Sequence, residues 1–317
     1  MTDGLDQDSH KPAKSGWRSK RSEIEAQVKA TREQLEHATE VIEARTGRNL
    51  PLAIIIGLAL GFAMLFSLIV VKELFMLFAA FVIFFSVIEL AWALRASGRR
   101  VPRLPTAIAA LATVPAAFYL GDFGHWWVSV AGVALVVVWR VVELANPKLR
   151  APAAEIWLDL AASTFIQIYI AFLASYSVLL TAKPGGQWWT LAYLILVISI
   201  DTGAYATGLT IGKHPMAPKI SPKKTWEGFA GSVVAAFIAG ILLSVFMIKQ
   251  PWWFGFIFGI VIVVSATIGD LAESMIKRDL GIKDISSWLP GHGGFLDRMD
   301  SVVLSSAAGY LLFLLFG

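Results

Sequence analysis

The hydrophobic residues of this chain are gathered into long stretches that few charged residues interrupt. A helix needs about 20 mostly apolar residues to cross the hydrocarbon core of a bilayer. The stretches predict nine such helices, at 50–71, 74–94, 105–121, 126–145, 157–181, 188–211, 229–248, 252–272 and 301–316. The third and the ninth are short for a full crossing. The pattern therefore predicts an all-α, polytopic integral membrane protein.

The first 48 residues differ from the rest, because they are polar and carry nine basic and nine acidic side chains. Ile24, Val28, Leu35 and Ile42 lie near the spacing of an amphipathic helix. No apolar segment follows the start Met, so a cleaved signal peptide is not expected. We therefore predict a cytosolic, partly helical extension at 1–48 and a membrane domain at 49–317.

The composition narrows the chemistry that the chain can perform. Hydrophobic residues make up 56% of it and charged residues 16%, which excludes a water-soluble enzyme. The absence of cysteine excludes disulfides, thiolate metal sites and a thiol nucleophile. A metal ion would need oxygen or histidine ligands. The formal net charge of +4 is small and scattered, so no nucleic-acid partner is expected.

Charge and tryptophan positions predict the orientation in the membrane. Basic side chains concentrate in the second, fourth, sixth and eighth connections between the predicted helices, as is typical of cytosolic loops. The tryptophan pairs at 126–127, 188–189 and 252–253 open the fourth, sixth and eighth helices, and would lie at the outer interface. Both signals predict a multi-pass protein of the cytoplasmic membrane whose N-terminus and polar loops face the cytosol.

Five ionisable side chains fall within the predicted helices, where an unpaired charge costs several kcal/mol. Glu89 and Arg140 are expected to pair with each other or to reach the interface. Asp159 is near a helix start, where the helix dipole favours an anion, so its predicted role is structural. Asp201 and Asp270 are the candidates for a functional site.

Two polar segments face the cytosol in this topology. The first, 213–228, holds four lysines and three prolines and is predicted to be a loop, because proline does not fit a long helix. The second, 274–300, has glycines around His292 that let the backbone turn sharply and approach a ligand. Directly before the last predicted helix come Asp297, Arg298 and Asp300.

Acidic and basic side chains flank the second segment. Asp270, Ser274 and Lys277 recur at positions i, i+4 and i+7 and therefore share one helix face. Carboxylate oxygens are ligands that Mg²⁺ takes, and Asp270 and Asp297 on either side of the segment indicate a two-cation site. Two metal ions suit an in-line displacement at phosphorus, with Lys and Arg supplying further positive charge. The residues thus predict a phosphotransfer site open to the cytosol.

The motif at 274–300 is specific enough to compare with known families. Its distinctive positions are Ser274, Lys277, Arg278, Lys283, Asp284, Ser286, Pro290, His292, Gly293, Gly294, Asp297, Arg298 and Asp300. This pattern resembles the signature of the phosphatidate cytidylyltransferase family, the CDP-diacylglycerol synthases. The segments 201–204 and 221–226, with Gly228 and Gly231, resemble another marked region of that family. The resemblance is strong over 195–317, and over 50–194 it rests on the hydrophobic pattern alone.

The resemblance implies a reaction of phospholipid biosynthesis, in which CTP and phosphatidate give CDP-diacylglycerol and pyrophosphate. It implies Mg²⁺, as two divalent ions, and leaves room for K⁺. Asp270 and Asp297 would be metal ligands, with Asp300 and Asp201 as further candidates. The catalytic residues would be Asp270, Asp297, Lys223 and Lys277. Groups expected to contact the substrates are Ser221, Lys224, Thr225, Arg278, His292, Gly293, Gly294 and Arg298. The partners would be CTP, phosphatidate and membrane lipid, with a homodimer as a further option.

Two other functions stay open. A CTP-dependent kinase of a lipid alcohol would share the nucleotide and the membrane site but transfer the γ-phosphoryl group. A transporter or channel would line a permeation path with Asp201, Asp270 and Arg140 and would show two repeated halves. The full motif at 274–300 argues against the kinase, and the lack of an internal repeat argues against the transporter.

Overall fold

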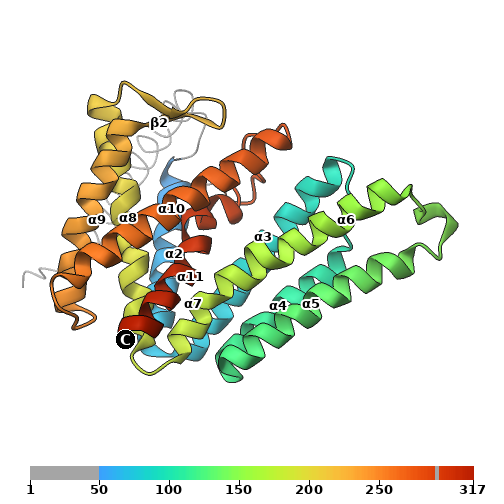
Figure 1. Cartoon of the computed structure of the whole chain (residues 1–317), viewed down its shortest axis with the longest axis horizontal. Helices are drawn as coiled ribbons and strands as arrows, with labels where there is room; N and C mark the ends of the chain where they lie inside the picture. The colour runs from blue at the N-terminus through green and yellow to red at the C-terminus, as the bar shows by residue number, and fades with distance from the viewer. Residues whose placement is uncertain (1–49, 290–292) are drawn as a thin grey trace, which may run out of the picture. The chain divides into compact units, whose positions relative to one another are not determined.

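The computed structural model describes residues 50–289 and 293–317, with side chains from Ile54 onward (Figure 1). The helical extension predicted at 1–48 and the motif residues Pro290 and His292 lie outside the described residues. Residues 56–317 form one unit. The contacts described below all lie within that unit.

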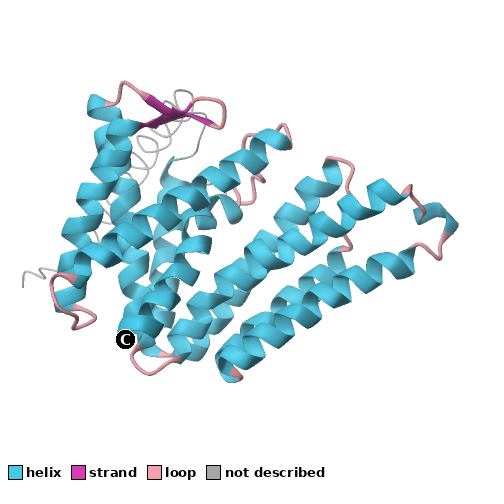
Figure 2. Ribbon diagram, in the orientation of Figure 1, coloured by secondary structure: helices cyan, strands magenta, loops and turns pink. Residues whose placement is uncertain are grey.

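Every stretch predicted to cross the membrane is helical (Figures 1 and 2). A short 3₁₀ turn, η1 (Pro147–Leu149), precedes α6, and a π-helical turn, η2 (Gln167–Phe172), joins α6 and α7 into one continuous helix. The helices are α2 (Leu50–Val70), α3 (Lys72–Ala96), α4 (Arg103–Tyr119), α5 (Gly121–Glu143), α6 (Ala153–Ile166), α7 (Leu173–Ala182), α8 (Gly186–Ile211), α9 (Trp226–Phe246), α10 (Phe254–Asp279) and α11 (Leu296–Phe316).

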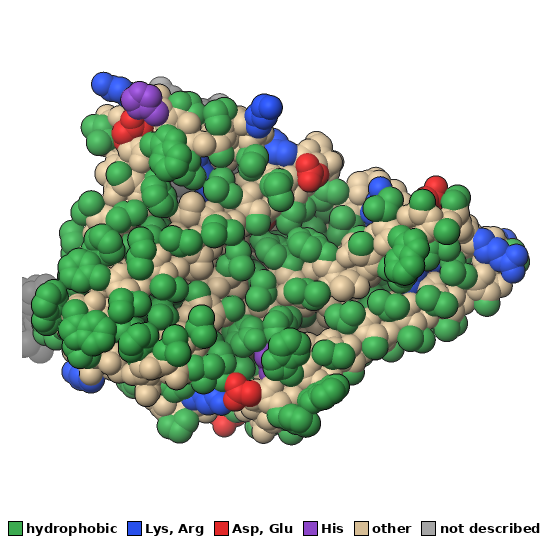
Figure 3. All heavy atoms as spheres, viewed as in Figure 1, with side chains coloured by type: hydrophobic (Ala, Val, Ile, Leu, Met, Phe, Trp, Pro, Cys, Tyr) green, Lys and Arg blue, Asp and Glu red, His purple; other side chains and the backbone are tan. Residues whose placement is uncertain are grey.

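Within the described residues, seven helical segments are long and apolar enough to cross a membrane. They are α3, α5, the continuous helix 153–182, α8, α9, α10 and α11. The other two predicted spans are not among these seven: α4 has 17 residues, and the part of α2 whose side chains are described is the apolar stretch Ile54–Val70. On the face in Figure 3, hydrophobic side chains cover most of the middle, and charged side chains lie mainly near the upper and lower edges. The chain is therefore a multi-pass helical membrane protein, while the count of nine stays a prediction.

Two helices that carry motif residues are longer than predicted. α11 begins at Leu296 rather than at 301, so Asp297, Arg298 and Asp300 lie inside its first turns and not before it. α10 continues to Asp279, well beyond 272. Both extensions carry charges that suit a helix end, because the N-terminus of a helix favours acidic groups and the C-terminus basic ones. A hydropathy pattern does not include this interaction of charged side chains with the helix dipole, so it predicted both helices too short.

The lysine-rich segment forms a hairpin rather than the predicted loop. β1 (Pro215–Ala217) pairs antiparallel with β2 (Ser221–Thr225), so the fold is not strictly all-α. Proline prevents a helix here but is compatible with extended backbone at a sheet edge. Thr225 then ends β2 and caps α9, because its Oγ1 accepts a hydrogen bond from the Gly228 N–H at 3.1 Å.

The predicted pairing of Glu89 with Arg140 was wrong. Arg140 on α5 instead donates two hydrogen bonds to one oxygen of Asp159 on α6, with Nε and Nη2 at 3.0 and 2.7 Å from Oδ2. The other Asp159 oxygen accepts the Arg100 N–H at 2.8 Å. Both side chains are buried, and a buried guanidinium needs such a directly opposed carboxylate. The Glu89 carboxylate instead contacts the start of α11, where it accepts the Leu296 N–H.

Five of the six tryptophans predicted at the outer interface are exposed, and one is not. Trp189 is 5% exposed and packs against Phe254 and Phe313, with ring centroids 5.6 and 5.5 Å apart. Its neighbour Trp188 takes the exposed position, since adjacent residues of a helix point in different directions. Of the pair at 188–189, Trp189 therefore belongs to the aromatic core with Phe254 and Phe313.

Close helix packing at glycines sets the spacing of the functional helices. A Cβ at Gly231 of α9 would lie 2.0 Å from Thr207 Oγ1 of α8, and one at Gly269 of α10 would lie 2.3 Å from the Asp300 carbonyl oxygen of α11. Gly269 and Asp300 are therefore in backbone contact. The apolar core behind them includes the fully buried Val87, Val178, Leu196, Ile262 and Val303.

We expect Asp159→Ala to lower the free energy of unfolding by about 3–5 kcal/mol, because it removes the carboxylate nearest the buried Arg140 guanidinium. The remaining partner, Glu143, is 3.7 Å from Nη1. The double variant Arg140→Met with Asp159→Leu should recover most of this loss, since it removes both charges. Thermal unfolding of the purified protein in detergent measures both effects. A double variant as unstable as the single one would contradict the assignment.

We expect Gly269→Ala to destabilise the protein by roughly 1–3 kcal/mol, because the new methyl group meets backbone that cannot move aside. The same change should move Asp270 away from Asp300 and lower turnover. Gly61→Ala in α2 is the matched control, because a Cβ there has nothing within 4 Å. Unfolding and turnover measured in parallel should separate the two variants, and equal behaviour would argue against the close packing.

Candidate active site

A polar pocket of about 340 Å³ lies between α8, α10, α11 and the segment that precedes α11. Its cationic lining consists of Lys277 and Arg298. The acidic lining is larger and consists of Asp201, Asp270, Asp284, Asp297 and Asp300. Carboxylates outnumber cationic groups here, so the pocket attracts additional positive charge.

The α10 side chains of the site share one face, as predicted. Ser274 Oγ lies 3.4 Å from Asp270 Oδ1, one turn away. Lys277, on the next turn, forms an ion pair with the fully buried Glu273 and places its Nζ 3.0 Å from Asp297 Oδ1. Lys277 therefore links α10 to the first turn of α11.

Backbone groups hold the Asp297 carboxylate as well. Its Oδ2 accepts the Gly294 N–H at 2.7 Å and the Ile285 N–H at 3.3 Å. Leu289 and Gly293 exchange backbone hydrogen bonds of 2.9 and 3.1 Å, which hold the two arms together. Gly293 has φ of +82°, a conformation that favours glycine. The Asp297 side chain is only 5% exposed, so its position is closely defined.

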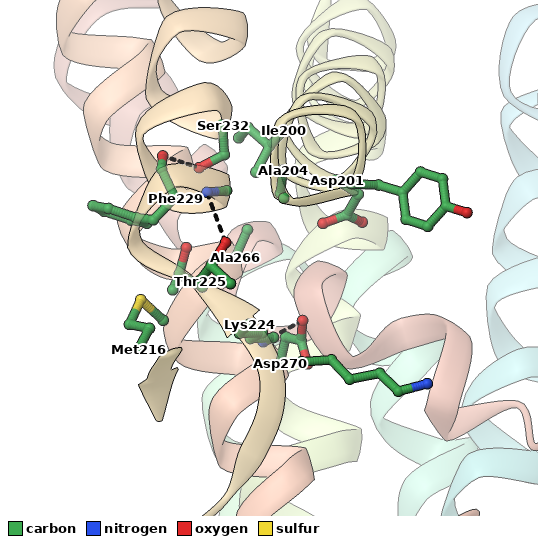
Figure 4. A pocket seen from close by; sticks show the side chains of 15 residues that line it. Ile200, Asp201, Ala204, Met216, Lys224, Thr225, Phe229, Ser232, Ala266 and Asp270 are labelled. Carbon is green, nitrogen blue, oxygen red and sulfur yellow. Dashed lines mark hydrogen bonds and ion pairs between the residues drawn. The ribbon is translucent and has the colours of Figure 1, made fainter. Parts of the chain in front are cut away.

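A second, mostly apolar pocket of about 410 Å³ adjoins the first and shares Asp201 and Asp270 with it. Its apolar lining includes Ile200, Ala204, Met216, Phe229 and Ala266. Figure 4 shows Lys224 of β2 directed at Asp270, with which it forms an ion pair, and Asp201 of α8 on another side of the pocket. A cation and two carboxylates thus lie where an apolar pocket meets a polar one.

The structure brings most of the predicted site residues together, although it does not test their roles. Asp201, Asp270 and Lys277 line the polar pocket with the α11 residues Asp297, Arg298 and Asp300. Lys223, Lys224 and Thr225 line the apolar pocket. Gly293 and Gly294 form the turn before α11. His292 lies outside the described residues.

Two predicted substrate contacts lie elsewhere. Arg278 lines neither pocket, and its Nε donates to the Ile220 carbonyl oxygen at 3.1 Å, which ties α10 to the hairpin. Ser221, at the start of β2, also lies outside the lining of both pockets. Arg278, although it belongs to the motif, therefore supports the framework rather than the pocket.

The prediction missed four residues that belong to the site or its support. Asp284 and Ser301 line the polar pocket, and Glu273 is buried directly behind Lys277. Glu89 reaches the start of α11 from α3. Asp284 could have been found from its place in the motif, and Glu89 from the cost of a carboxylate within a span. The partners of Glu89 are backbone N–H groups at the start of α11, and no sequence pattern identifies them.

The donors of the polar pocket fit a magnesium ion in chemical kind. Among the described residues, no three His, Cys, Asp or Glu side chains are gathered as a complete ligand set. Mg²⁺ does not need such a set, because it usually binds one or two carboxylates and completes its shell with water and substrate phosphates. Two such carboxylates, Asp201 and Asp270, lie at the junction of the pockets.

Comparison with known proteins identifies the family of the chain. The chain is 35% identical over 284 residues to the phosphatidate cytidylyltransferase of Mycobacterium bovis, covering 87% of this chain and 91% of that one. It is 36% identical over 276 residues to the enzyme of the same name from Mycobacterium leprae, covering 84% and 88%. With the Haemophilus influenzae protein of that name it shares 36% identity over 183 residues, which is 56% of this chain and 62% of the other. The model of the cytidylyltransferase family matches residues 52–316, and the chain therefore belongs to that family.

Proposed function

We propose that this protein is a phosphatidate cytidylyltransferase of the cytoplasmic membrane, which converts CTP and phosphatidate to CDP-diacylglycerol and pyrophosphate. The observation that carries the proposal is the pair of adjoining pockets, one polar and one apolar, which share Asp201 and Asp270. Such a pair suits a reaction between a water-soluble triphosphate and a membrane lipid. The names of the relatives supply the particular substrates.

The apolar pocket suits the glycerol and upper acyl part of the lipid. Its walls come from α8, α9 and α10 and are mostly hydrocarbon, with Lys223 and Lys224 at the hairpin. The Lys224 ammonium is already beside Asp270 at the boundary with the polar pocket. A lipid phosphate placed there would accept a charge-assisted hydrogen bond from the Lys224 ammonium, in place of part of the contact of Lys224 with Asp270.

The polar pocket suits the triphosphate. A phosphatidate oxygen would attack the α-phosphorus of CTP, the bond from that phosphorus to the bridging oxygen would break, and pyrophosphate would leave. The phosphate nucleophile is ionised at neutral pH, so the barrier is charge repulsion rather than proton removal. Lys277 and Arg298 supply positive charge on the pocket wall.

Asp270 and Asp297 would hold divalent cations, with Asp201 and Asp300 as further ligands. Bound Mg²⁺ would neutralise charge on the attacking and leaving oxygens. The Lys277 contact with Asp297 holds that carboxylate in place until the site is loaded. Whether K⁺ also binds stays a prediction.

The same site would open to the cytosol. The β1–β2 hairpin lies at the end of α8 and α9 opposite the C-terminus (Figure 1). The connection that contains it holds four lysines, which supports a cytosolic position under the positive-inside rule. CTP would then arrive from the cytosol and phosphatidate from the inner leaflet, so neither substrate crosses the membrane.

We expect purified wild-type protein to form lipid-linked CDP and pyrophosphate with Mg²⁺ and to form none in EDTA. Asp297→Asn should lower turnover by roughly 100-fold or more, because it weakens both the cation site and the Lys277 contact. Asp279→Asn is the matched control, since Asp279 is exposed on α10 and lines neither pocket. Product analysis by mass spectrometry decides the reaction: a phosphorylated lipid alcohol with CDP as by-product would indicate the kinase instead.

We expect Lys219→Cys in the hairpin connection to be protected from a membrane-impermeant maleimide in intact spheroplasts and labelled after lysis. Lys249→Cys, between α9 and α10, should be labelled in both. Because the natural chain has no cysteine, each variant carries a single reactive thiol. Gel-shift labelling measures this accessibility, and the reverse pattern would overturn the cytosolic placement of the site.

A further inference from the structure

The geometry points to Glu89 of α3 as a positioning residue for the start of α11, acting from outside the 274–300 motif. Its carboxylate accepts the Phe295 N–H on Oε1 and the Leu296 N–H on Oε2, each at 3.0 Å. The first N–H groups of a helix have no partners within the helix and carry its positive dipole end. Glu89 therefore binds the N-terminus of α11 with both oxygens.

Glu89 also contacts the other arm of the same turn. Ser286 Oγ donates to Glu89 Oε1 at 2.5 Å and accepts the Trp288 N–H at 3.3 Å. Asp297 joins the two arms in a parallel way, through Ile285 and Gly294. Two carboxylates, one from α3 and one from α11, thus hold residues 285–286 against residues 294–296.

Gly294 lies between these two carboxylates. A Cβ at this position would be 2.8 Å from Glu89 Oε2 and 3.1 Å from Asp297 Oδ2. Only a residue without a side chain leaves room for both oxygens to reach backbone N–H groups here. The position of Glu89 is therefore linked sterically to that of Asp297 through Gly294.

Aromatic side chains of α3 cover the turn and exclude water from these hydrogen bonds. Phe85 stacks on Phe295 with centroids 5.0 Å apart and meets the Trp288 ring edge-on at 5.6 Å. Glu89 itself is 1% exposed. Hydrogen bonds to a charged group in such an environment are stronger and more directional than at a surface. Loss of the charge should therefore release the turn.

The consequence for catalysis rests on the proposed function, whereas the hydrogen bonds themselves do not. Displacement of a catalytic group by about 1 Å can cost about 100-fold in rate. Glu89→Gln keeps the size of the side chain but turns one acceptor into a donor that faces a backbone N–H. We expect kcat to fall about 10- to 100-fold, with the KM for phosphatidate changed less than about twofold, because Glu89 does not line the apolar pocket.

The test compares Glu89→Gln and Ser286→Ala with wild type in lipid nanodiscs. Hydrogen exchange followed by mass spectrometry, without metal or nucleotide, should show faster exchange at 293–296 in Glu89→Gln. Ser286→Ala removes one of the three donors and should show a smaller change in the same direction. Asp159→Asn is the control for the loss of a buried carboxylate away from the site: it should lower the unfolding temperature but leave exchange at 293–296 and kcat unchanged.

Wild-type exchange and kcat in Glu89→Gln would overturn the inference, as would an equal loss of kcat in Asp159→Asn. If Glu89→Gln does not fold, wild-type exchange in Ser286→Ala overturns it instead. If the wild-type protein makes no CDP-diacylglycerol, the proposed function fails, but the exchange comparison needs no substrate and still decides the role of Glu89.

Discussion

The cost of burying a carboxylate away from water organises this membrane domain. Asp159 meets that cost with the Arg140 guanidinium, Glu273 with the Lys277 ammonium, and Glu89 with the backbone N–H groups of α11. The Glu273 pair lies within α10, whereas the Asp159 and Glu89 contacts each join two different helices. Satisfying those two charges therefore also fixes how one helix lies against the next. Asp297, a carboxylate of the proposed active site, is likewise held by an ammonium group and by backbone N–H groups.

Hydropathy predicted where the helices are but not where they end. The apolar runs coincide with helices because no other backbone satisfies its own hydrogen bonds within a bilayer. The start of α11 was placed five residues late, since Asp297, Arg298 and Asp300 look like a loop on any hydropathy scale. Their helical state depends on acceptors at the N-terminus, and one of those comes from Glu89, more than 200 residues earlier in the chain. Long-range partners of this kind leave no local pattern.

The grouping of the predicted site residues was anticipated better than the contacts that support them. An ionisable residue within a membrane span is costly unless it has a partner or a function, and for this reason Asp201 and Asp270 were predicted to belong to the site. The structure places both at the junction of the two pockets. The pairing of Glu89 with Arg140 was wrong, because the cost of burying a charge requires a partner but does not identify which residue provides it. Position in the motif also did not determine the role of a side chain. Lys277 lines the polar pocket, whereas its neighbour Arg278 contacts the hairpin. Adjacent residues of a helix point about 100° apart.

The motif at 274–300 is a folded unit whose residues hold one another as much as they hold a ligand. Gly294 is needed because two carboxylates approach it, and backbone N–H groups from both arms fix the Oδ2 of Asp297, the proposed cation ligand. One of those two carboxylates belongs to α3, which the motif does not include. The framework of the motif therefore extends into a helix outside it. If the proposed function and the proposed role of Glu89 hold, turnover depends on this hydrogen-bonded carboxylate of α3 as well as on the residues that line the pockets.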